Sequence, residues 1–133
     1  MAILNQKNLC PPNMSVYHKP GYQAGKKMKL SIASKMVESY AEGSRTNDLR
    51  SVTMSASLIR NIIDQPNCEF VRVFFALEHH VKPKNIGVSQ GHALVFVGAD
   101  AHGKNIINGE NNTEVYEDGV MCPPDCPESG PNL

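Results

Sequence analysis

The fold of this chain is decided by the ten-residue run CEFVRVFFAL at residues 68–77. From residue 70 onward apolar side chains fall on both faces of the run, and Arg72 is the sole charge among them. A strand that is apolar on both faces is typical of the centre of a sheet that is covered on both sides. We therefore predict a buried central strand at this position.

Further strands are predicted downstream of this run. Residues 93–97 (ALVFV) have the same apolar character, and residues 100–103 (DAHG) form a turn signal that leads into a strand at residues 104–107. Residues 108–109 (NG) and 118–119 (DG) are turn signals as well, with a short edge strand expected at Val115 and Tyr116 between them. Strands joined in this way predict an antiparallel meander.

Two helices are expected before the strands. Ile32, Met36 and Tyr40 recur every four residues, which gives one apolar stripe on a helix over residues 29–42. A short strand at residues 51–54 precedes a second helix, in which Ser55 or Ser57 is the cap and Pro66 the stop. The second helix presents one apolar face: Leu58, Ile59, Ile62 and Ile63. Helices that precede strands favour an α+β fold, two helices packed on a small, mainly antiparallel sheet.

Length and composition set the domain organisation. The 133 residues suit one domain, which we assign to residues 29–133, including an acidic tail with the sequence Cys-Pro-Pro-Asp-Cys at residues 122–126. Residues 1–28 are rich in proline and glycine and are expected to form an extended basic arm.

Charge and hydropathy exclude several classes of function. The net charge is zero, which argues against a nucleic-acid partner, and no apolar run approaches the roughly 20 residues that cross a membrane. The first residues lack a secretory signal, so we expect a soluble cytoplasmic protein with free thiols or metal ligands rather than structural disulfides.

The charges are nevertheless uneven along the chain. Six lysines and no acid precede Glu38, whereas six acids and no base follow Lys104. The two ends are therefore complementary, and we expect them to lie near each other within one subunit or across a homodimer. The other interpretation, a patch of Lys26, Lys27 and Lys29 for phosphate, is weakened by the lack of arginine and aromatic residues among them.

The cysteine pair Cys122 and Cys126 is the first candidate site. Three intervening residues fit the spacing of a zinc knuckle, and thiolate is a preferred zinc donor. A four-donor site would have to recruit histidines, and His79, His80 and His92 lie on the connection between the two buried strands. The favoured expectation is that no cofactor binds; the alternative is a zinc ion, with these five residues as its predicted ligands.

A redox role for the same pair is a second interpretation. Exchange catalysts of the thioredoxin type have two residues between the cysteines and a helix to lower the thiol pKa, whereas here Asp125 and Glu128 disfavour thiolate. The third interpretation is that Cys122 and Cys126 pack as small apolar side chains and anchor the C-terminal segment. Phosphate-binding glycine loops, serine nucleophile elbows and helical zinc motifs are absent from the sequence, which lowers the case for an enzyme without removing it.

One resemblance to known proteins rests on these segments. Residues 51–63, 71–77, 94–97 and 116–119, leading into the Cys-Pro-Pro-Asp-Cys motif, resemble a family of short bacterial proteins that have no assigned function and share a terminal Cys-Pro-Pro-x-Cys. The similarity spans about residues 30 to 126. It implies a small intracellular α+β domain and carries over no catalytic residues.

Two classes of function remain open from the sequence. The first is a non-enzymatic binding or assembly domain, a homodimer or the partner of another protein, whose acidic tail lies against the sheet or is presented to that partner. The second is a thiol-dependent metal or redox protein that uses Cys122 and Cys126.

Overall fold

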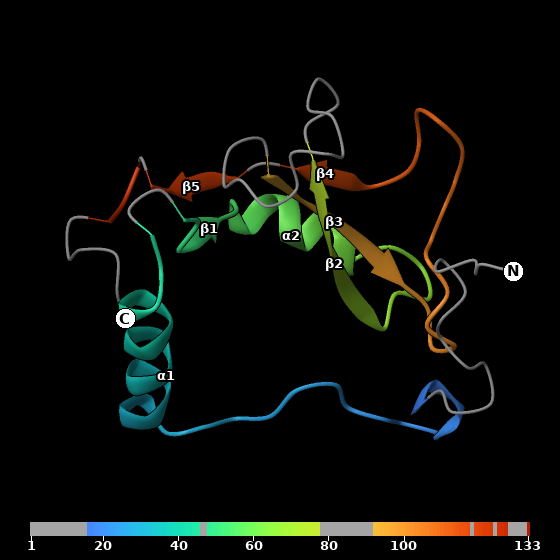
Figure 1. Ribbon diagram of the computed structural model, residues 1–133. Coiled ribbons are helices and arrows are strands. Elements are labelled where there is room, and N and C mark those ends of the chain that lie inside the picture. The colour runs from blue at the N-terminus through green and yellow to red at the C-terminus, as the bar shows by residue number, and fades with distance from the viewer. Residues whose placement is uncertain (1–15, 46–47, 78–91, 118, 124, 128–132) are drawn as a thin grey trace, which may run out of the picture.

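The computed structural model describes residues 16–45, 48–77, 92–117, 119–123, 125–127 and 133 (Figure 1). Its helices and strands confirm the α+β class. In chain order they are η3 (Val16–His18), α1 (Leu30–Glu42), β1 (Ser51–Thr53), α2 (Ala56–Ile63), β2 (Phe70–Leu77), β3 (His92–Ala99), β4 (Val115–Glu117) and β5 (Val120–Cys122). Within these ranges no helix is both long and apolar enough to cross a bilayer.

The strands form two antiparallel sheets. The larger has the order β2-β3-β4, which is the predicted meander, and it pairs Phe70 with Ala99 at one end of the hairpin and Leu77 with His92 at the other. The smaller pairs β1 with β5, and Ser51 lies opposite Cys122. The predicted strand at residues 104–107 is reduced to a single bridge between Asn105 and Ala99, so this prediction was wrong in extent.

Helix α2 packs on one face of the larger sheet. Ser55 precedes it at the N-cap and Asp64 follows it at the C-cap, two residues before Pro66. Ile62 is fully buried, and a Cβ on Gly98 of β3 would lie only 3.2 Å from its Cγ2. The absence of a side chain at Gly98 therefore lets α2 approach the sheet closely. The remaining buried apolar residues among those described are Ala93, Val97, Ala99 and Cys122.

The prediction that β2 is a central strand was wrong. Strand β3 is central, and β2 lies at the edge of the described sheet. Its apolar side chains are largely exposed, and Phe75 exposes 93% of its surface. The apolar pattern marks β2 correctly as a strand, but the single short helix α2 packs near the Gly98 end of the hairpin and does not cover its length.

Helix α1 is confirmed, and its apolar stripe remains exposed. None of its residues is buried, and Figure 1 shows the helix standing apart from the larger sheet. The hydroxyl of Tyr40 donates a hydrogen bond to the carbonyl of Leu49 at 2.8 Å, and the hydroxyl of Ser34 donates to the Leu133 carbonyl at 3.3 Å. The C-terminal residue thus lies against α1.

Candidate functional site

The C-terminal cysteine pair is joined in this structure. Cys122 and Cys126 form a disulfide, with their Cα atoms 4.5 Å apart, where the sequence favoured free thiols or metal ligands. Cys122 is only 1% exposed, whereas Cys126 is exposed. The bridge therefore has one protected end and one end on the surface.

The backbone holds Cys122 from two sides. The amide of Arg50 donates a hydrogen bond to the Cys122 carbonyl at 2.7 Å, which extends the pairing of β1 with β5. One residue earlier in β5, the Met121 carbonyl accepts a hydrogen bond from the amide of Asp125 at 2.9 Å. The start of the acidic tail is thus a sheet strand followed by a tight turn.

Of the five predicted metal ligands, the structure brings together Cys122 and Cys126, and no described contact adds a histidine to them. His79 and His80 lie outside the described residues, and His92 begins β3 with its side chain likewise outside the description. Among the described side chains, no group of three or more histidine, cysteine or acidic residues could hold a metal ion. The zinc site of Cys122, Cys126 and these histidines therefore stays a prediction.

Cys68 is a free cysteine. It is half-buried, and its thiol donates to the Phe70 carbonyl at a sulfur-to-oxygen distance of 3.4 Å. This contact joins the turn after α2 to the first residue of β2. Its place beside Gly98 suits a packing role.

The edge strand β2 provides a second candidate site. We define the β2 surface as its four exposed large apolar residues: Val71, Val73, Phe74 and Phe75. Alternate residues of a strand point to opposite faces, and Val71 pairs with Gly98, which faces Ile62 of α2. Val71, Val73 and Phe75 therefore lie on the α2 face and Phe74 on the other. No described strand pairs with the outer edge of β2. Main-chain hydrogen-bonding groups and apolar side chains are therefore presented together.

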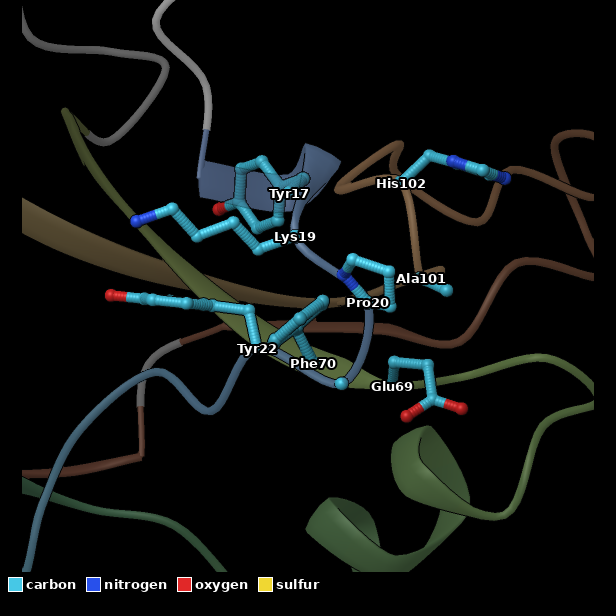
Figure 2. Close-up of a pocket in the computed structure, with 9 residues that line it drawn as sticks. Tyr17, Lys19, Pro20, Tyr22, Glu69, Phe70, Ala101 and His102 are labelled. Atoms are coloured by element: carbon cyan, nitrogen blue, oxygen red, sulfur yellow. The ribbon is translucent and has the colours of Figure 1, made fainter.

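A pocket of about 440 Å³ lies at the beginning of β2 (Figure 2). Its walls come from η3 and the turn after it, from the first residues of β2, and from the turn after β3. The lining residues are Tyr17, Lys19, Pro20, Gly21, Tyr22, Glu69, Phe70, Ala101 and His102. Segments that are far apart in the sequence thus meet here.

Tyr17 is the residue that ties these segments together. Its ring packs edge-on against Phe70, with ring centres 5.3 Å apart, and its hydroxyl accepts a hydrogen bond from the Arg72 guanidinium at 2.9 Å. Arg72 also donates to the Asn105 side chain at 2.6 Å. The sole charge within the apolar run is therefore satisfied by partners before and after it in the chain.

Asp100 shapes the turn on the other side of the pocket. Its carboxylate accepts hydrogen bonds from the amides of Lys104 at 3.0 Å and His102 at 2.9 Å. These bonds, led by that from Lys104, lower the pKa of Asp100 below its ordinary value of 3.8. The predicted turn at residues 100–103 is therefore confirmed, and an ionised side chain supports it.

On the α2 face, Tyr116 of β4 forms a small polar cluster. Its hydroxyl donates a short hydrogen bond to the Glu114 carboxylate and accepts one from the Asn61 side chain at 3.3 Å. The bond to Glu114 raises the pKa of Tyr116 above 10.0. This cluster links α2 to β4.

Sequence reasoning missed the pocket. Tyr17 belongs to the segment that was assigned to an extended arm, and the two tyrosines there, Tyr17 and Tyr22, form no periodic pattern that would reveal their contacts. The available signal was Arg72, because a charge inside an otherwise apolar strand needs a partner from elsewhere in the chain.

Comparisons with known proteins add no relative. No protein-family model matches the chain, and neither the curated proteins nor the solved structures include a significant match. The resemblance to short bacterial proteins with a terminal Cys-Pro-Pro-x-Cys stays a prediction.

Proposed function

We propose that this protein is a non-enzymatic assembly domain that joins a second copy of itself through the open edge of β2. The observation that carries this proposal is the exposure of Phe75, at 93%, on an edge strand where Val71, Val73 and Phe74 are also exposed. Contiguous apolar exposure on an unpaired edge favours strand pairing with another chain. Pairing of two β2 strands gives the main-chain groups hydrogen-bond partners and removes the apolar side chains from water.

The charge pattern of β2 supports a second copy as the partner. Antiparallel pairing of two identical strands about a two-fold axis is self-complementary. If the pairing is centred on Phe74, each Phe75 lies opposite the partner's Val73 on the same face, and each Arg72 lies opposite the partner's Ala76. The two arginines are then kept apart, and the cross-strand contacts are apolar.

Sedimentation of matched variants tests this proposal. Phe75→Lys introduces a charge on the exposed edge, and Ile107→Lys makes the same change at a position that is 67% exposed outside the strands. We expect wild-type protein and Ile107→Lys to dimerise with rising concentration, while Phe75→Lys stays monomeric with an unchanged circular dichroism spectrum. A wild-type chain that stays monomeric up to millimolar concentration, or a dimer indifferent to Phe75→Lys, would contradict the proposal.

A second candidate function follows from the cysteine pair. The disulfide between buried Cys122 and exposed Cys126 supports a thiol-dependent redox role, and the reduced pair would offer two thiolates to zinc. Thiol counting before and after reduction, together with elemental analysis of protein purified without chelator, tests both forms. Protein that neither carries metal nor reoxidises after reduction would exclude this candidate.

A further inference from the structure

The pocket beside Tyr17 has the walls of a ligand site. Its volume of about 440 Å³ lies within the range of small-molecule sites. Three aromatic rings line it, those of Tyr17, Tyr22 and Phe70, and Pro20 adds a further flat apolar surface. Such walls favour a planar ring that stacks on them.

The contacts of Tyr17 show that this wall is in place before any ligand arrives. Arg72 bonds its hydroxyl, Phe70 packs against its ring, and a Cβ on Gly103 would lie 2.5 Å from the same ring. The ring is thus held from three directions by β2 and by the turn after β3. Because the Tyr17 ring is already held in place, a ligand that packs on it does not lose binding free energy to ordering this side chain.

The polar groups of the pocket are arranged asymmetrically. In Figure 2 the hydroxyls of Tyr17 and Tyr22 and the ammonium of Lys19 leave the pocket on the same side. The guanidinium of Arg72 is bonded to that Tyr17 hydroxyl, so a second positive charge lies behind it. The carboxylate of Glu69 points away from the rings on the opposite side. The Lys19 ammonium and the two tyrosine hydroxyls therefore gather on one side of the pocket, away from the Glu69 carboxylate.

We propose that this pocket binds a flat aromatic anion, a ring system of one or two fused rings that bears a carboxylate or phosphate group. The rings stack on Phe70 and Tyr22, and the acidic group lies at the mouth beside Lys19, where the Tyr22 hydroxyl donates to it. This site is separate from the outer edge of β2, and it stands whether or not the protein assembles through that edge.

Three probes of the same shape and different charge test the ligand class. We would titrate the isotope-labelled full chain with 1-naphthoate, 1-naphthamide and 1-naphthylmethylammonium and follow the backbone amide resonances. Naphthoate is expected to shift the amides of Gly21, Tyr22, Phe70 and Ala101 with a dissociation constant on the order of 1 mM or tighter. The neutral amide should bind roughly three- to tenfold more weakly, and the cation more weakly still.

Substitutions then locate the charge and the ring contact. Lys19→Gln should weaken the binding of naphthoate roughly three- to tenfold, to about the affinity of the amide. Lys35→Gln on α1 removes the same charge outside the pocket and should leave naphthoate binding unchanged. Tyr22→Leu should weaken all three probes alike.

Several results would overturn the proposal. With the wild-type protein, these results are equal affinity for naphthoate and the amide, highest affinity for the cation, resonance shifts spread over the whole chain, or no saturable binding of naphthoate. With Lys19→Gln, the contradicting result is an affinity for naphthoate equal to that of wild type. None of these results bears on dimerisation. The proposed ligand site and the proposed assembly through β2 are therefore tested separately.

Discussion

The Tyr17 hydroxyl lies 2.9 Å from the Arg72 guanidinium that donates to it, and the guanidinium carbon lies 5.6 Å from the centre of the Tyr17 ring. This contact joins a residue of the basic N-terminal segment to the middle of the strand that decides the fold. Arg72 needs such a partner because its charge is half-buried. The part of the predicted arm around Tyr17 is therefore anchored on the larger sheet.

Gly103 is predicted to be essential for this anchor. A Cβ there would overlap the Tyr17 ring at 2.5 Å, and the backbone φ of +80° adds strain to any other residue. We expect Gly103→Ala to lower the free energy of unfolding by about 2–4 kcal/mol, of which about 1 kcal/mol arises from the backbone. Urea unfolding measures this change.

Gly109→Ala is the matched control for this substitution. Gly109 also has a positive φ, +92°, but nothing lies within 4 Å of the added Cβ. Its cost should be the backbone part alone, about 1 kcal/mol. Equal losses for the two variants would show that the ring of Tyr17 does not pack against Gly103.

Ile62 and Ile63 are neighbours on α2 with opposite environments. Ile62 is fully buried beneath Gly98, whereas Ile63 exposes 47% of its surface. We expect Ile62→Ala to cost about 2–4 kcal/mol through the cavity it leaves, and Ile63→Ala to cost less than about 1 kcal/mol. Chemical denaturation followed by circular dichroism compares them, and a larger loss for Ile63→Ala would refute the described packing of α2.

Local sequence pattern accounts for the elements that were predicted correctly. The four-residue spacing of α1, the apolar face of α2 and the turn residues after β3 act over a few residues, so they can be interpreted without the rest of the chain. The apolar run at residues 70–77 likewise marks a strand. The apolar pattern does not show what covers this strand, another part of the same chain or a second chain. For this reason β2 was predicted at the centre of the sheet.

The features that escaped prediction are contacts between distant residues. Ser51 pairs with Cys122, and Tyr17 packs on Phe70, yet neither pair leaves a periodic signal in the sequence. Strand β5 was hidden for a further reason: its last residue is the first cysteine of the tail motif, and metal binding, redox chemistry and packing were considered for it, but strand pairing was not. Its burial beside β1 is a packing property that the thiol chemistry does not report.

The disulfide is expected to stabilise the smaller sheet without being required for the larger one. The loop closed by Cys122 and Cys126 is short, so the double substitution Cys122→Ala with Cys126→Ala should cost roughly 2 kcal/mol. Amide exchange should remain slow in β2 and β3 and become faster in β1 and β5. Reductant should lower the melting temperature of wild-type protein and of Cys68→Ala but leave the double variant unchanged. A collapse of the whole fold on reduction would contradict this separation of the two sheets.

The lowered pKa of Asp100 predicts how this carboxylate contributes to the free energy of unfolding at acid pH. Its pKa is lowered chiefly by the Lys104 amide, so the folded chain holds the ionised form more strongly than the unfolded chain does. The stabilising contribution is therefore fully present above the unfolded value of 3.8 and is lost as the pH falls through the lower folded pKa.

Carbon-detected titration of the Asp100 side chain should place its midpoint below 3.8. Asp100→Asn keeps an acceptor oxygen but removes the titration, so its stability should fall less steeply between neutral and acid pH than that of wild type. A midpoint at or above 3.8, or parallel acid curves for wild type and Asp100→Asn, would show that the amides of the turn do not hold this carboxylate.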